Sequence, residues 1–147
     1  MKLRRVFVLL CFVLFLSGCE YKNEDFSRQC SWSVKSTDVY NSTKERVSFN
    51  NSDEVTYAVI TKSYKAKTDD GQMIVSNVKK SATSYNNSLL KYDGVRISIL
   101  NDSDSLYTVR YYLDVKSASD EVLDMFELKR NSIKFFNKMK KKGLECK

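Results

Sequence analysis

The segment at residues 105–116 constrains the fold of this chain more than any other, because its hydrophobic and polar residues alternate strictly. It reads SLYTVRYYLDVK. In an extended strand successive side chains point to opposite faces, so one face would carry Tyr107, Val109, Tyr111, Leu113 and Val115. The opposite face would be mostly polar and wet. This alternation is typical of an antiparallel strand with one buried face.

Four other segments with strand character precede this one along the chain. They read CSWSVKSTDVY from Cys30, ERVSF at 45–49, EVTYAVITKSYKA at 54–66 and VRISIL at 95–100. Short polar runs, Asn50–Asp53 and Asn101–Asp104, separate two pairs of these segments. Asn, Asp and Ser favour turns, so we predict two β-hairpins.

Between the hairpins the hydrophobic period becomes helical. Apolar residues recur at helical spacing at Ile74, Val78, Ala82, Tyr85 and Leu89. This spacing predicts an amphipathic helix over about 70–92 that buries these residues. Asp93 and Gly94 would end it.

Two shorter helices are predicted near the C-terminus. One would begin near Ser119 and reach about Leu128, and Asn131 would cap a second. The second would turn Ile133, Phe136 and Met139 inward and end at Gly143. The chain is therefore predicted to form one α+β domain over 30–147, with an antiparallel sheet of about four to six strands. The long helix and the C-terminal helices would pack on one face.

The N-terminus has the three parts of an export signal. Lys2, Arg4 and Arg5 precede an apolar run of eleven residues, Val6–Leu16, and small residues follow. The run is too short to span a hydrocarbon core of about 30 Å at about 1.5 Å per residue. We therefore assign residues 1–18 to a signal peptide.

The sequence Leu16-Ser17-Gly18-Cys19 resembles the lipobox of bacterial lipoproteins. The resemblance implies cleavage between Gly18 and Cys19, and attachment of membrane lipid to the Cys19 thiol. It places the protein on the outer face of the cytoplasmic membrane. Residues 19–29 are polar without periodicity, and we predict a lipidated terminus and a flexible tether there.

The layout of the whole chain is similar to that of small lipoproteins from low-G+C Gram-positive bacteria. The shared features are the lipobox, the tether, an early cysteine in CSW, an α+β body and a late cysteine in GLECK. The body resembles the YehR-like lipoprotein family, whose function is unknown. That family has no established active site, so the resemblance implies no catalytic residue.

The cysteines suggest a disulfide. Cys11 would leave with the signal peptide and Cys19 would carry lipid, so Cys30 and Cys146 are the thiols left in an exported domain. We predict that they pair, with Trp32 and Leu144 packed beside the bridge. The alternative is two unpaired thiols, since many Gram-positive bacteria make few disulfides.

The net charge of +7 comes from 25 basic and 18 acidic residues. The basic residues form no dense stripe of the kind that nucleic-acid binders use, so no nucleic-acid partner is expected. The densest local charge is a set of lysines on the last helix: Lys134, Lys138, Lys140, Lys141 and Lys142. They are either a solvated helix end or a contact with anionic lipid or cell-wall polymer.

The residue types argue against an enzyme. The chain has no histidine, the usual general base and a common metal ligand, and no paired catalytic arrangement is evident. We expect no catalytic residue, metal or cofactor. The favoured function is a monomeric, lipid-anchored, non-enzymatic module that binds a ligand or contacts the envelope. The alternatives are an accessory subunit of a membrane transporter or cell-wall complex, with an unknown protein partner, and a small wall-modifying hydrolase.

Overall fold

The computed structural model describes residues 25–147. The predictions for the signal peptide and the lipobox, including Gly18 and Cys19, lie outside the described residues. No helix in the described range is long and apolar enough to cross a membrane.

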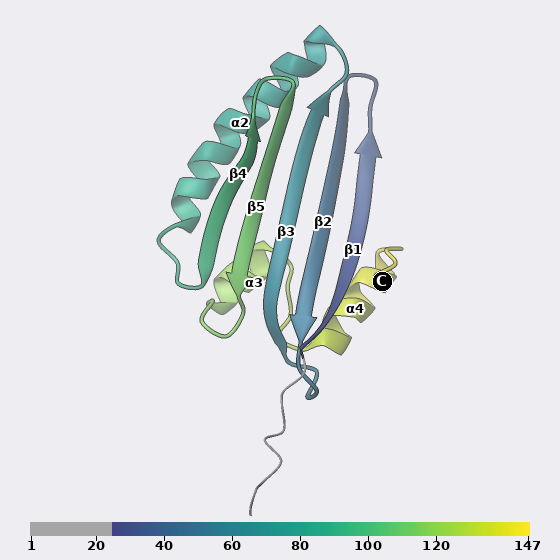
Figure 1. Ribbon diagram of the computed structural model, residues 1–147, viewed down its shortest axis with the longest axis vertical. Helices are drawn as coiled ribbons and strands as arrows, with labels where there is room; N and C mark the ends of the chain where they lie inside the picture. Colours follow the sequence, from purple (N-terminus) through teal and green to yellow (C-terminus); the bar gives the residue numbers. More distant parts are fainter. Residues whose placement is uncertain (1–24) are drawn as a thin grey trace, which may run out of the picture.

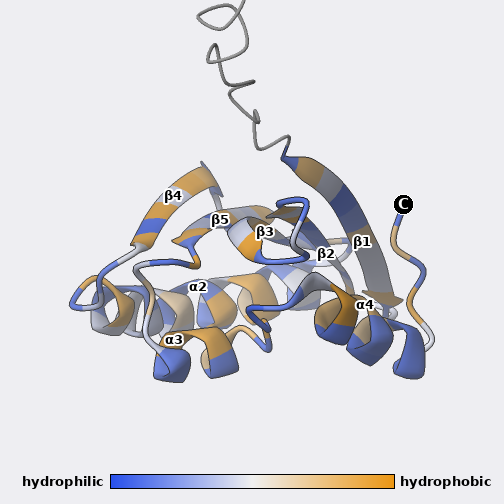
Figure 2. Ribbon diagram, turned by 90° about the horizontal axis from the view of Figure 1, so that it is seen from below, coloured by the Kyte–Doolittle hydropathy of each residue, from blue (hydrophilic) through white to orange (hydrophobic). Residues whose placement is uncertain are grey.

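Five antiparallel strands form one sheet in the order β1-β2-β3-β5-β4, and three helices lie on the same side of it (Figures 1 and 2). The strands are β1 (Phe26–Lys35), β2 (Val39–Phe49), β3 (Val55–Ala66), β4 (Val95–Asp102) and β5 (Leu106–Asp114). The helices are α2 (Asp69–Leu89), α3 (Asp120–Met125) and α4 (Ser132–Lys141). The predicted α+β fold with an antiparallel sheet is confirmed.

The alternation in β5 predicts its buried face correctly. All five residues predicted there, from Tyr107 to Val115, are at most 2% exposed. The opposite face is less wet than expected: Thr108 is buried and bonds to Ser63 through the two hydroxyl oxygens at 2.9 Å. Thr108 is buried because β5 lies between β3 and β4, and both neighbouring strands shield this face.

The first strand begins earlier than predicted. Residues 26–29, assigned above to the tether, belong to β1 and pair with β2. The rings of Phe26 and Phe49 lie 5.9 Å apart across these strands. The predicted boundary at residue 30 is therefore wrong by four residues, because pairing with β2 orders a segment whose own composition is polar.

Helix α2 begins as expected, but its buried face is rotated about the helix axis relative to the predicted face. The Thr68 side chain accepts a hydrogen bond from the Gly71 amide at 3.0 Å and caps the helix. The buried face carries Gly71, Val75, Asn86 and Leu89, whereas Ile74 and Tyr85 are 44% and 37% exposed. Ile74 and Tyr85 are therefore not buried as predicted, although both line a cavity between α2 and the sheet, and the helix ends at Leu89 rather than Tyr92.

Two contacts explain this rotation. A β-carbon on Gly71 would lie 2.2 Å from the Asp38 carbonyl oxygen, so only glycine allows this approach. At the other end, the Tyr111 hydroxyl donates a hydrogen bond of 2.9 Å to the Asn86 side chain. A buried tyrosine hydroxyl needs such a partner, and Asn86 supplies it from within the core.

The C-terminal helices also differ in detail from the prediction. Helix α3 ends at Met125, and the following chain turns at Glu127, which has a positive φ of 57°. Asn131 caps α4 as predicted, accepting from the Lys134 amide at 3.0 Å. However, α4 buries Ser132, Phe135 and Met139.

Ile133 is 54% exposed, so its predicted inward position is wrong. The Ser132 hydroxyl donates to Asp53 Oδ1 at 3.0 Å, and this contact with the β2–β3 turn sets the rotation of α4. Gly143, at φ 76°, ends the helix with its amide bonded to the Lys140 carbonyl at 2.9 Å.

Candidate functional site

A disulfide joins Cys30 and Cys146, as predicted, across 116 positions of the sequence. Next to the disulfide the C-terminal residues pair with the edge of β1 in an antiparallel arrangement. The amides of Gln29 and Lys147 each donate a hydrogen bond to the other residue's carbonyl, at 2.6 and 2.9 Å. Cys30 is fully buried. The disulfide and this backbone pairing together fix the last residues of the chain against the edge of the sheet.

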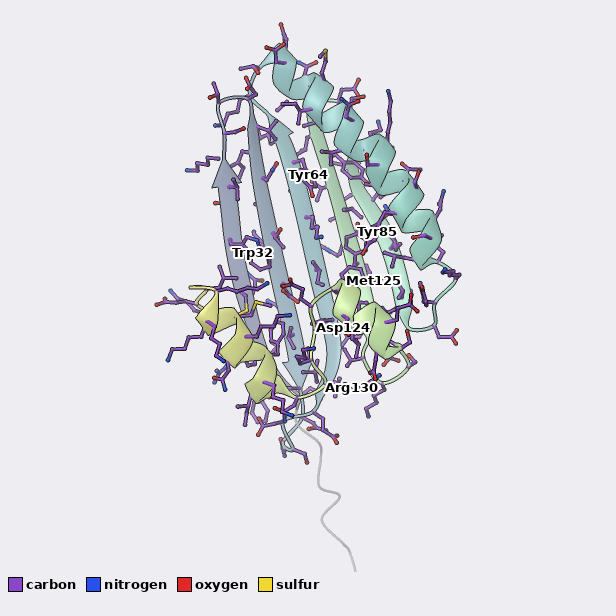
Figure 3. The ribbon with its side chains drawn as sticks, turned by 180° about the vertical axis from the view of Figure 1, so that it is seen from behind. Trp32, Tyr64, Tyr85, Asp124, Met125 and Arg130 are labelled. Atoms are coloured by element: carbon purple, nitrogen blue, oxygen red, sulfur yellow. A yellow bond between two sulfur atoms is a disulfide. The ribbon has the colours of Figure 1, made fainter. Side chains whose placement is uncertain are left out.

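Beside the disulfide lies a pocket of about 480 Å³ between the sheet and the C-terminal elements. In Figure 3, which looks onto the face that carries the helices, Trp32 on β1 and Met125 on α3 flank β2 and β3 from the left and from the right. Trp32 and Leu144 both line the pocket, and their packing against the disulfide itself stays a prediction. The full lining is Trp32, Thr43, Glu45, Ile60, Lys62, Met125, Phe126, Glu127, Met139, Lys142 and Leu144.

Glu45 is the unusual residue of this pocket. It lies on β2 between Cys30 of β1 and Ile60 of β3, and it is only 2% exposed. Within the described residues its Oε1 atom has no hydrogen-bond partner. Buried carboxyl oxygens are nearly always hydrogen-bonded, so Glu45 offers an unused polar atom to a ligand.

Burial raises the pKa of Glu45 to about 7, and the negative charge of Glu127 acts in the same direction. Lys62, Lys142 and Lys138 oppose this shift in pKa without cancelling it. Because desolvation disfavours the charged form, Glu45 is partly protonated near neutral pH. It can then donate as well as accept a hydrogen bond.

Glu127 and Lys142, the residue after α4, form the charged rim of the pocket, and Lys138 of α4 lies close to Glu127. Lys142 Nζ contacts Glu127 Oε2, and Lys138 Nζ lies 3.9 Å from the same oxygen. The hydrogen bond from Lys142, with the charge of Lys138, lowers the pKa of Glu127. The rim therefore holds a carboxylate between two ammonium groups.

The set of lysines predicted to contact an anionic surface is thus divided. Lys138 and Lys142 are directed to Glu127, whereas Lys134, Lys140 and Lys141 are exposed and form no ion pair among residues 25–147. The contact with an anionic surface stays a prediction for the exposed members.

A second cavity of about 490 Å³ lies between α2 and the sheet, and Lys62 borders both cavities. Its walls include Tyr64 and Tyr85 (Figure 3), and Tyr111. Burial raises the pKa of all three tyrosines, so their hydroxyls stay protonated. The Lys62 ammonium lies 5.9 Å from the centre of the Tyr111 ring, within the range of a cation–π contact.

The sequence analysis missed Glu45 and Glu127. A signal for Glu45 existed, because Glu45, Val47 and Phe49 alternate with Arg46 and Ser48 and so share a strand face. Nothing local marks Glu127, which reaches the pocket only through the turn after α3. Within 25–147 no three side chains of the metal-binding types His, Cys, Asp or Glu are grouped to hold an ion.

Comparisons with known proteins show the fold alone. No protein-family model and no curated protein matches the chain. One solved structure, "NMR structure of the protein from Streptococcus pneumoniae TIGR4", is similar with a TM-score of 0.54 at 10% sequence identity. The match covers 86% of this chain and 87% of that one. The α+β architecture thus occurs in a solved structure, and the resemblance to YehR-like lipoproteins stays a prediction.

Proposed function

We propose that this protein is a lipid-anchored, extracytoplasmic lipoprotein that binds a small ligand in the pocket beside the disulfide, without catalysis. The observation that carries the proposal is the buried Oε1 atom of Glu45, which has no hydrogen-bond partner among residues 25–147 and belongs to a side chain that lines a pocket of about 480 Å³. Ligand pockets commonly have this size, with mostly apolar walls and few polar groups.

The lining defines the chemistry of the ligand. Trp32, Phe126 and Leu144 offer apolar area, while Glu45 and Lys62 offer hydrogen bonds near the base. A small amphipathic molecule, with an apolar part against Trp32 and a polar group toward Glu45, satisfies both. In this proposal the long helix α2 and the C-terminal helices support the pocket by packing on the same face of the sheet.

The anchor has a direct test. Changing Cys19→Ala removes the thiol that would accept the lipid, so uncleaved precursor should accumulate and labelling with radioactive palmitate should be lost. The measurement is labelling of whole cells followed by separation of membrane and soluble fractions. Lipid labelling and cleavage like those of the parent would contradict the anchor, and a Cys11→Ala variant, which should behave like the parent, is the matched control.

The pocket has a built-in reporter, because Trp32 is the one tryptophan of the chain. The probe 1-anilinonaphthalene-8-sulfonate combines an aromatic body with an anionic group and absorbs tryptophan emission. Saturable quenching of Trp32 at one probe per protein is expected. Changing Thr43→Phe fills the space between Trp32 and Lys62 and should weaken binding about tenfold, equivalent to about 1.4 kcal/mol.

The matched control is Thr61→Phe, which adds the same side chain on the next strand but on the opposite face of the sheet. It should change the affinity for the probe less than about twofold, or about 0.4 kcal/mol. Equal weakening by both variants, or quenching that never saturates, would contradict the pocket as the binding site.

A further inference from the structure

The sheet face turned away from the three helices (Figure 2) is strongly basic. Strand alternation and register place six cations on it. They are Lys35, Lys44, Arg46, Lys65, Arg96 and Arg110. We call this surface the outer face; among its strand residues Asp114 is the one acid, and it lies at the end of β5.

Register brings the central cations together from different strands. Lys44 of β2 and Arg110 of β5 lie in one row across the sheet, with Thr61 of β3 between them. Arg46 and Arg96 lie in the next row, together with Tyr112. Because neighbouring strands are about 4.8 Å apart and alternate residues about 7 Å apart, these rows form one compact basic surface.

Among residues 25–147 these cations have no carboxylate partner. Neutral groups orient the two central arginines instead: Arg110 Nε donates to Thr61 Oγ1 at 3.1 Å, and an Arg96 nitrogen donates to the Tyr57 hydroxyl at 3.2 Å. The guanidinium groups are therefore positioned without being neutralised.

A shallow depression of about 350 Å³ lies at the centre of the outer face. Lys44, Arg46 and Arg110 border it, with the Thr61 hydroxyl and the Tyr112 ring. Arginine forks and lysine ammonium groups bind phosphate oxygens well, and three cations around one depression match the charge of a phosphodiester chain that crosses it. Hydroxyl side chains at Ser31, Ser42 and Ser63 continue the polar surface on both sides.

We propose that the outer face is a docking surface for a phosphodiester-linked anionic polymer of the cell envelope, with Lys44, Arg46 and Arg110 as its main contacts. A polymer fits this surface better than a membrane does, because insertion into lipid needs exposed apolar side chains. The aliphatic residue of the depression is Val59, which is only partly exposed. The ligand pocket is on the opposite face of the sheet, so this inference goes beyond the proposed ligand binding and does not depend on it.

The test compares two double variants with equal changes in charge. Lys44→Gln/Arg46→Gln removes two cations of the outer face, and Lys80→Gln/Lys91→Gln removes two exposed cations, on α2 and just after it, that form no ion pair among residues 25–147. Binding of the full-length protein in non-ionic detergent to immobilised poly(glycerol phosphate) is measured over a series of salt concentrations. Poly-glutamate and vesicles containing phosphatidylglycerol serve as competitors.

The outer-face variant should bind about tenfold more weakly or worse at low salt, and its salt dependence should be shallower by about one to two charges. The Lys80→Gln/Lys91→Gln variant should stay within about twofold of the parent. Poly-glutamate and vesicles should compete poorly. Equal losses in both variants, absence of binding by the parent, or stronger competition by poly-glutamate or vesicles would each overturn the proposal.

Discussion

Changing Cys146→Ser should lower the free energy of unfolding by about 4–5 kcal/mol, because the disulfide closes a loop of more than one hundred residues in the unfolded chain. Cys146 is the suitable partner to replace, since it is partly exposed whereas Cys30 is fully buried. The serine hydroxyl can therefore reach water. Urea denaturation followed by circular dichroism measures the effect.

Reduction provides the control for this prediction. A thiol reductant should bring the parent close to the stability of the variant and should leave the variant unchanged. The C-terminal bridge between Gln29 and Lys147 depends on the same disulfide, so the amides of both residues should exchange faster in the variant. A loss below about 1 kcal/mol, within the range of an ordinary surface substitution, would contradict the role assigned to the disulfide.

Changing Glu45→Gln should increase the free energy of unfolding, relative to the parent, more at neutral pH than at acid pH. Burial raises the pKa of Glu45 from 4.5 to about 7, so the folded state holds the proton more tightly than the unfolded chain. The stability that comes from this proton is complete below pH 4.5 and is lost as the pH rises to about 7. In the parent this loss amounts to about 3 kcal/mol.

The glutamine variant does not titrate at this position, so its stability relative to the parent should increase by about 3 kcal/mol between pH 4 and pH 8. Ionisable groups that do not interact with Glu45 contribute equally to both proteins and cancel from the difference. Glu145→Gln makes the same chemical change at an exposed position near the C-terminus, and its difference from the parent should be flat. A flat difference for Glu45→Gln as well would show that the carboxyl is not desolvated in solution.

The local features of the sheet could be predicted from the sequence because each depends on neighbouring residues. The alternation in residues 105–116 identified the buried face of β5, since side chains of a strand alternate whatever it pairs with. The cap at Asn131 and the turn at residues 50–53 likewise depend on local hydrogen bonds. The second predicted turn exists but is displaced, because β4 continues to Asp102 and the chain turns at residues 103–105. The disulfide followed from counting the thiols that an exported domain would retain.

The rotation of the helices could not be predicted in this way. On α2 the hydrophobic period favours a stripe through Ile74 and Tyr85, whereas the buried face includes Gly71 and the polar Asn86. The close approach of Gly71 to Asp38 and the bond between Asn86 and Tyr111 determine the buried face. On α4 the contact of Ser132 with Asp53 plays the same part.

The sequence by itself determined the class of the fold, the buried face of β5 and the two cysteines that pair, because local periodicity and composition govern these features. Only the tertiary structure decided which residues form the ligand pocket and the outer face. Glu45, Lys62 and Glu127 line one pocket, and Lys44 and Arg110 share one row of the sheet, because strand register and chain reversal bring distant stretches of sequence together. Contacts of this kind depend on which strands pair and in which register, and no local pattern encodes that pairing.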